Sequence, residues 1–488
     1  MPPAELSEGV DVRLVIHGGT VVTPGGKFDA DIWCVDGTIE ALTTARPVAR
    51  ADEVIDARGK LVFPGFIDPH IHSRDPGLTH KEDFAHATRA AAAGGVTTVI
   101  DMPNTIPPVT DLDTYHAQVR RQADVAFVDF ALWALAVGVD NLSDLSALLG
   151  EGVAAVKLFW GYSLTRDEKR IVWNLGDEPE DRIIRPPTNG QVMELFDAIA
   201  RTGGVLAAHC EDLQLVEVCH RKLGRRPRDY EEFLMSRPDA AEASAIALGI
   251  EFARATKCRF HVVHVASARG IELIRRAQRD GIAVTAETCP HYLWFTNEDY
   301  DTVGPVMKVF PPIYRRRDRA RLLQAVAAGT VQSIGSDHAP HTLEEKTGEI
   351  ATQAPGFIGV EVLARAMLDL ANRGWLSVER LSWVLSEGTA RLYELYPRKG
   401  AILPGSDADF TIVDMSAQWT VRSEVLQSKN AITPWDRVSG IGAPCQAIVR
   451  GHVVMDGGQL VGEAIGQHVR AVRNSNHLTR HPEAQAVR

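Results

Sequence analysis

Two histidines separated by a single residue, His70 and His72, follow an apolar run at residues 61–63. The run predicts a buried strand, and residues i and i+2 of a strand point to the same face. Two imidazoles on one side of a strand end have the geometry to hold a metal ion. A bare His-x-His pair also occurs by chance on surface turns, so its interpretation depends on the rest of the chain.

Four further residues that can bind a metal ion or a proton stand at the ends of apolar runs: Lys157, His209, His264 and Asp337. A lysine in such a run either reaches the surface or loses its charge, because an isolated buried charge is costly. A neutral amine can react with CO2 to form a carbamate, which can bridge two metal ions. One histidine alone is more often a core residue, and Asp337 alone could be a ligand, a base or a cap. We prefer His264 over His261, since His264 lies nearer the strand end.

The middle of the chain alternates strand and helix patterns. The strand candidates end near His72, Asn104, Ala136, Phe159, His209, His264, His291 and His341. Helical spacing of apolar residues separates several of them, at 191–202, 240–255 and 268–279. Eight such units predict an α/β fold, a (β/α)8 TIM barrel over residues 64–394. In such barrels the chemistry lies at the carboxyl ends of the strands, where these residues stand.

Short strand patterns separated by Gly and Asp-Gly turns occupy both ends of the chain. They predict one small β-sandwich domain built from both termini, residues 1–63 and 395–465. Residues 466–488 carry Arg and His without apolar periodicity and are predicted to be a disordered tail or an arm across a subunit interface. Residues 173–187, rich in charge and proline, are predicted to be a loop insertion near the mouth of the active site.

A net charge of −11 argues against a partner that is a nucleic acid or an anionic membrane. An anionic substrate would therefore need specific local cations. The six cysteines are scattered and form no C-x-x-C pair, which suggests a reducing compartment. The chain has no apolar run of 18 residues, and its first residues lack a secretory pattern. We expect a cytoplasmic protein.

The complete set of residues resembles the amidohydrolase superfamily, in the cyclic amidase branch of dihydroorotases, hydantoinases and allantoinases. The resemblance covers roughly residues 12–463. It implies a first Zn2+ held by His70, His72, Lys157 and Asp337, and a second held by His209, His264 and the same lysine as N6-carboxylysine. It also implies that a hydroxide bridging both ions attacks the ring amide, with Asp337 as general base and then general acid. Relatives are commonly homodimers or homotetramers. Some have lost their ligands and act as non-catalytic scaffolds, but here every position is filled.

The substrate motifs point in two directions. Arg74, Asn104 and His341 match the positions that bind the ring carboxylate in dihydroorotases, and such groups suit a carboxylate. Singly, each could instead be an ordinary loop residue. The segment 157–162 resembles hydantoinases, in which a tyrosine at the position of Tyr162 stabilises the oxyanion. We predict dihydroorotase activity on a small cyclic amide, dihydroorotate, which is converted reversibly to N-carbamoyl-aspartate. Hydantoinase or dihydropyrimidinase activity is the alternative, followed by allantoinase activity.

Overall fold

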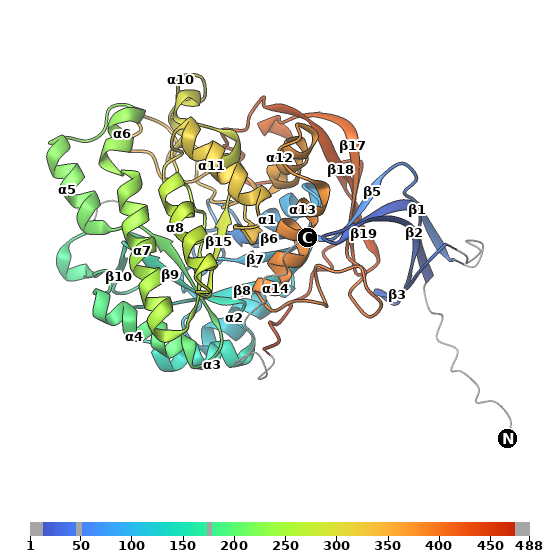
Figure 1. Ribbon diagram of the computed structural model, residues 1–488, viewed down its shortest axis with the longest axis horizontal. Helices are drawn as coiled ribbons and strands as arrows, with labels where there is room; N and C mark the ends of the chain where they lie inside the picture. The colour runs from blue at the N-terminus through green and yellow to red at the C-terminus, as the bar shows by residue number, and fades with distance from the viewer. Residues whose placement is uncertain (1–12, 45–50, 173–177, 474–488) are drawn as a thin grey trace.

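The computed structural model describes residues 13–44, 51–172 and 178–473, in which a barrel lies beside a separate sheet (Figure 1). The barrel strands pair in parallel in chain order. They are β6 Phe66–Ile71, β7 Val96–Asp101, β8 Asp129–Leu135, β9 Ala155–Trp160, β13 Val205–Cys210, β14 Arg259–Val262, β15 Val284–Thr288 and β16 Ser333–Ile334. The predicted TIM barrel is confirmed.

Helices cover the outside of the barrel and explain why its strands are continuous apolar runs. Every residue of β6, β7, β8, β9 and β13 is buried. The longer helices are α1 Phe84–Ala93, α2 Leu112–Ala123, α3 Leu142–Glu151, α4 Asn189–Ala200, α5 Leu213–Leu223, α7 Asp239–Thr256, α8 Ala268–Arg279, α11 Arg316–Ala327 and α12 Val360–Asn372. Helix α4 starts with a capping box between Thr188 and Gln191, and it buries the apolar face that its spacing predicts.

The first and last barrel strands are joined mainly beyond the end of β16. His72 N donates to His338 O at 2.8 Å, and His338 N donates to His70 O at 3.3 Å. The carboxylate of Asp68 in β6 accepts a hydrogen bond from Ser336 N at 3.0 Å. The barrel therefore closes at the segments that carry three of the predicted metal ligands.

The second domain is a sheet to which both ends of the chain contribute. Its strands are β1 Arg13–Thr23, β2 Gly26–Val35, β3 Thr38–Thr43, β4 Glu53–Asp56, β5 Leu61–Pro64, β17 Phe410–Thr420, β18 Ser439–Val449, β19 His452–Asp456 and β20 Gln459–Leu460. Strand β17 pairs antiparallel with β5, which joins the two parts. Ile16 and Ile32 share an apolar core with Phe410 and Ile448. This confirms the prediction of a small β domain built from both termini.

Two predicted strand ends differ from the structure. β15 ends at Thr288, and His291 lies in the short helix α9, Pro290–Trp294. Pro290 favours this helix start because its fixed φ suits the first helical turn. β16 has two residues, so His341 lies in the loop that follows rather than at a strand end.

The prediction of a disordered tail or intersubunit arm does not hold for residues 466–473. This segment lies against the barrel of its own chain. Phe130 N donates to Gln467 O at 3.0 Å, and Val469 N donates to Phe130 O at 2.7 Å. Both bonds use backbone groups of Phe130 in β8, a contact that sequence periodicity cannot reveal. Residues 474–488 lie outside the described residues.

Among its described residues, the predicted insertion at 173–187 contains one short strand, which pairs with a strand that precedes the insertion. β10 Ser163–Thr165 pairs with β11 Ile171–Val172 and with β12 Ile183–Ile184 in a small antiparallel sheet. Residues 173–177 of the insertion lie outside the described residues. The rest of it is therefore tied to the segment that follows β9, the strand that carries Lys157.

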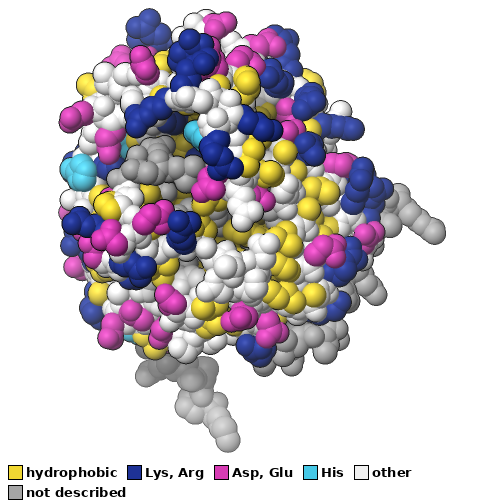
Figure 2. Space-filling view, turned by 90° about the vertical axis from the view of Figure 1, so that its left-hand side faces the viewer, with side chains coloured by type: hydrophobic (Ala, Val, Ile, Leu, Met, Phe, Trp, Pro, Cys, Tyr) yellow, Lys and Arg dark blue, Asp and Glu magenta, His cyan; other side chains and the backbone are white. Residues whose placement is uncertain are grey.

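Figure 2 shows the face that lies at the left of Figure 1. Acidic and basic side chains are interspersed there around a region in which hydrophobic side chains gather. Within the described residues, no helix is both long and apolar enough to cross a membrane.

A buried lysine joins the two domains. Lys399 Nζ lies 2.5 Å from Asp409 Oδ2 and 2.9 Å from Asp407 Oδ2, and it also contacts Asp129 of β8. The lysine side chain is 1% exposed. A buried charge is tolerated only when it is paired, so these contacts fix the position of the sheet relative to the barrel.

We expect Lys399→Met to lower the free energy of unfolding by about 3–5 kcal/mol, because it leaves the buried carboxylate of Asp409 without its cation. Urea unfolding followed by tryptophan fluorescence measures this loss. Arg398→Met is the control, since Arg398 pairs with Asp407 from a side chain that is 46% exposed and surface pairs contribute about 0–1 kcal/mol. Equal losses in both variants would contradict the buried role of Lys399.

Candidate active site

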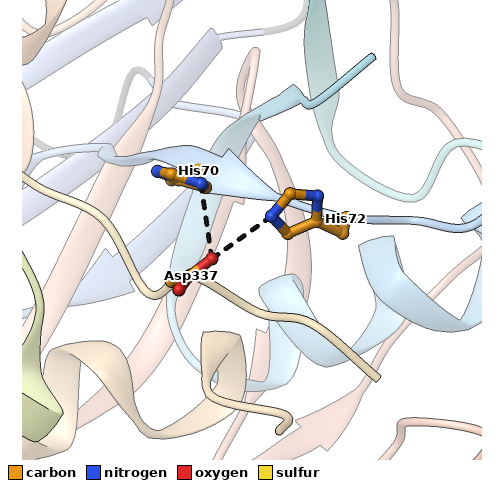
Figure 3. A group of neighbouring side chains, drawn as sticks. All are labelled: His70, His72 and Asp337. Carbon is orange, nitrogen blue, oxygen red and sulfur yellow. Dashed lines mark hydrogen bonds and ion pairs between the residues drawn. The ribbon is translucent and has the colours of Figure 1, made fainter. Parts of the chain in front are cut away.

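Three predicted ligands meet where the barrel closes. Asp337 Oδ1 lies 3.3 Å from His70 Nε2 and 3.2 Å from His72 Nε2. Figure 3 shows the carboxylate facing both imidazoles, with His70 on strand β6. All three side chains are buried. Two imidazole nitrogens and a carboxylate oxygen that converge in this way could hold a divalent cation.

A second group adjoins the first. His209 Nδ1 lies 3.0 Å from His264 Nε2, and the rings of His70 and His264 are 5.3 Å apart. His261 is buried elsewhere, with Nδ1 2.8 Å from Thr285 Oγ1. The structure therefore brings His264, rather than His261, to the predicted site.

Lys157 reaches the same pocket from β9. Its Nζ is buried and has no hydrogen-bond partner among the described residues. Burial lowers the pKa of Lys157 to about 8, although the carboxylates of Glu287 and Asp337 oppose this shift. A buried amine with a lowered pKa is unusual as a structural group and is more typical of a reactive one.

One pocket collects these groups. Its lining includes His70, His72, Arg74, Asn104, Lys157, His209, His264 and Asp337, together with Phe159, Val309, Phe310, Ala339, Pro355 and Gly356. All six predicted ligands and two of the three predicted substrate residues thus face one space. Tyr162 and His341 do not line this pocket.

The backbone is strained at three of these positions. Arg74, His264 and Asp337 have φ values of 63°, 40° and 50°, in the left-handed region that residues other than glycine rarely adopt. Such strain costs about 1–3 kcal/mol per residue and persists only where the surroundings impose it. A Cβ on Gly335 would lie 2.7 Å from His70 Cβ, so only glycine permits the close approach of this segment to β6.

Three of the candidate ligand histidines form a polar contact through the ring nitrogen that does not face the candidate metal site. The contacts are His70 Nδ1 with Glu287 Oε1 at 2.7 Å, His72 Nδ1 with Asn104 Oδ1 at 2.5 Å, and His209 Nε2 with Glu211 Oε2 at 2.8 Å. An imidazole that donates through one nitrogen presents a lone pair on the other, which orients it toward a metal. Sequence reasoning missed both glutamates. Their signal was weak but present, since each stands at or just after the end of a barrel strand.

Tyr162 belongs to the network around Glu211. Its hydroxyl donates to Glu211 Oε2 at 2.6 Å, and Arg237 Nη1 donates to the same oxygen at 2.8 Å. Burial alone would raise the pKa of Glu211, but the charge of Arg237 and the hydrogen bond from His209 outweigh it and lower the pKa to about 2. Arg237 was not predicted from the sequence. Its guanidinium lies 3.6 Å from the centre of the Phe310 ring.

Arg74 and His341 meet beside the pocket. Arg74 Nη2 lies 3.4 Å from His341 Nε2, and Arg74 Nε donates to Pro340 O at 3.2 Å. Arg74 is 3% exposed, and burial lowers its pKa to about 10. Within the described part of the chain, no carboxylate lies within 4.0 Å of its guanidinium; the nearby Glu345 pairs with Lys81 at 2.6 Å instead.

Comparison with known proteins agrees with this geometry. The model of the amidohydrolase family matches residues 61–454. The allantoinase of Rubrobacter xylanophilus is 38% identical over 467 residues, covering 94% of this chain and 98% of its own. The dihydroorotase of Methanothermobacter thermautotrophicus is 32% identical over 442 residues, covering 91% and 94%. The solved L-hydantoinase (dihydropyrimidinase) from Arthrobacter aurescens superposes with a TM-score of 0.87 at 31% identity, covering 94% and 99%.

The predicted family is therefore confirmed, and so is the prediction of an enzyme, a hydrolase that acts on cyclic amides. The strand ends of this barrel gather histidines, a lysine and an aspartate in one pocket, and the sequence matches these relatives along most of its length. The chain therefore belongs to the amidohydrolase family, in the branch that contains allantoinases, hydantoinases and dihydroorotases.

Proposed function

We propose that this protein hydrolyses a cyclic amide that carries a carboxylate, and that its substrate is dihydroorotate, which it opens to N-carbamoyl-aspartate. The observation that carries the proposal is the buried guanidinium of Arg74, which lines the pocket without a carboxylate partner among the described residues. A buried cation needs an anion to offset its desolvation. A substrate carboxylate supplies one.

Asn104 supports the same substrate. If His72 binds a metal through Nε2, its Nδ1 carries hydrogen and must face an acceptor, which fixes Asn104 Oδ1 on that side. The amide group of Asn104 is then left to donate from the pocket lining. His341 does not line the pocket, but its contact with Arg74 would help to position the guanidinium that binds the substrate carboxylate.

The donor set fits two divalent cations, which we propose to be zinc. His70, His72 and Asp337 would hold one ion, and His209 with His264 would hold the other. Lys157, as a carbamate, would provide a ligand to both ions. Its Nζ is buried and has no hydrogen-bond partner among the described residues, and this supports the proposed carbamate. Two bound cations would polarise the ring carbonyl and lower the pKa of a water molecule.

Asp337 is placed to move the proton that ring opening requires. Its Oδ1 lies between two imidazoles, so Oδ2 is the atom that can take a proton from the attacking water. The same oxygen can pass that proton to the leaving ring nitrogen, as general base and then general acid. The apolar part of the pocket lining, Val309 and Phe310, limits the access of other water molecules.

Allantoinase or hydantoinase activity is the second candidate. The 38% identity to an allantoinase and the TM-score of 0.87 to an L-hydantoinase favour it. These similarities extend over the whole chain, however, whereas Arg74 addresses the substrate itself. A shared fold does not determine the substrate.

A side-by-side assay of zinc-loaded protein with dihydroorotate, N-carbamoyl-aspartate, dihydrouracil, hydantoin and allantoin tests the proposal. We expect turnover of the first pair only. Turnover of allantoin or hydantoin with none of dihydroorotate would reject the carboxylate assignment in favour of the second candidate.

We expect Arg74→Gln to reduce kcat/KM for dihydroorotate by about 30- to 5,000-fold, because losing one partner of a buried charge pair costs about 2–5 kcal/mol. Any residual activity on uncharged hydantoin should change far less. Steady-state kinetics on both substrates measures the difference. Arg276→Gln is the control, since Arg276 of α8 forms a surface pair with Glu272 from a side chain that is 66% exposed. Equal losses on both substrates would contradict the role of Arg74.

The pKa of Lys157 predicts a pH-dependent stability for the metal-free protein. The charged amine destabilises the folded chain below about pH 8, and this cost falls as the pH rises toward 10.5, where the unfolded chain loses the same proton. We therefore expect metal-free Lys157→Met to be more stable than the wild type by about 3 kcal/mol at pH 7 and by about 1 kcal/mol at pH 9.5.

Urea unfolding of both proteins in chelator-treated, CO2-free buffer measures this gap. An advantage of Lys157→Met that stays constant between the two pH values would show that the amine does not lose its charge on folding.

A further inference from the structure

A buried carboxylate, Glu211, stands behind His209 on the side away from His264. Three donors converge on its Oε2: His209 Nε2 at 2.8 Å, the Tyr162 hydroxyl at 2.6 Å and Arg237 Nη1 at 2.8 Å. All four side chains are buried. Apart from His209, none of them lines the pocket of the candidate ligands.

The contact with Glu211 decides which nitrogen of His209 can bind a metal. An ionised carboxylate only accepts hydrogen bonds, so Nε2 carries the hydrogen and Nδ1 keeps its lone pair. Nδ1 is the atom that lies 3.0 Å from His264 Nε2. The arrangement at His70 is the reverse, because Glu287 contacts Nδ1 and leaves Nε2 to face Asp337. The carboxylate behind each ring therefore selects the nitrogen that faces the site.

Glu211 is itself fixed from several segments of the chain. Arg237, the residue after α6 (Tyr230–Ser236), stacks its guanidinium 3.6 Å from the centre of the Phe310 ring. Tyr162 follows β9 and packs edge-on against His209, with ring centres 4.8 Å apart. The charge of Arg237 offsets the charge of Glu211, so the carboxylate can stay ionised while buried.

We propose that Glu211 is a positioning residue for the second metal ion: it directs His209 Nδ1 toward that ion, and Tyr162 and Arg237 hold it in place. This inference rests on the two-metal site of the proposed function. It also assigns the Tyr162 hydroxyl to the support of His209, where it acts through the metal site and not directly on the substrate.

The test is an equilibrium titration of metal-free protein with Co2+, followed by visible absorption and checked by metal analysis. Wild-type protein should bind two ions per chain. In Glu211→Gln the dissociation constant of one ion should rise about 10- to 100-fold, the usual effect of losing a group that orients a ligand, while that of the other stays within about threefold. The absorption spectrum of the weakened ion should also change, which a general loss of stability would not produce.

Glu361→Gln is the matched control. Glu361 is a buried glutamate of α12 that accepts a hydrogen bond from Gln427 N at 2.8 Å and does not line the pocket. This variant should bind both ions like the wild type. Tyr162→Phe, which removes one donor and keeps the ring, should weaken the same ion as Glu211→Gln by a few fold, and it carries the test if Glu211→Gln does not fold.

Normal binding of both ions by Glu211→Gln would overturn the proposal, and so would equal weakening in Glu361→Gln. Tyr162→Phe with normal metal binding but slower turnover would place its hydroxyl on the substrate and contradict the inference. If the wild-type protein itself binds fewer than two ions, the proposed two-metal site fails together with the inference about Glu211. If the wild type binds two ions and Glu211→Gln also binds both normally, only the inference about Glu211 fails.

Discussion

The closure of the barrel is the interaction on which the site depends. The backbone bonds between His72 and His338 join the first strand to the segment after the last, and Asp68 adds a bond to Ser336 N. His70, His72 and Asp337 stand on those two segments. The contacts that close the barrel therefore also bring the first ligand group together. The positive φ of Asp337 persists because both sides of the closure hold it.

Two buried lysines show how differently the fold treats the same side chain. Lys399 contacts carboxylates from both domains, and these raise its pKa against the opposing effect of burial. Lys157 has no hydrogen-bond partner among the described residues, and burial lowers its pKa. The first lysine is satisfied by the protein and serves stability. The second lacks such a partner, and a buried amine with a lowered pKa is more typical of a reactive group than of a structural one.

The pocket contains two kinds of residues: candidate metal ligands and candidate substrate-binding residues. The ligand groups and their supporting glutamates serve a reaction that the whole branch could share. Arg74 and Asn104 line the same pocket, and in the proposed function they bind the carboxylate of the substrate. Overall similarity weighs every residue equally, so it is dominated by the barrel and the shared chemistry. This is why relatives of three activities resemble the chain to similar degrees, and why the substrate must be argued from a few side chains.

The sequence by itself determined the barrel, the sheet built from both termini and the candidate ligands, because strand ends leave a local pattern of apolar runs followed by polar residues. It predicted the choice of His264 over His261 for the same reason. Only the tertiary structure decided which groups stand behind the ligands, since Glu287 and His70 are far apart in the chain and meet through closure of the barrel. The sequence also did not predict that residues 466–473 pack on β8, or that the Tyr162 hydroxyl donates a hydrogen bond to Glu211. Contacts between distant segments depend on packing, and local periodicity carries no record of them.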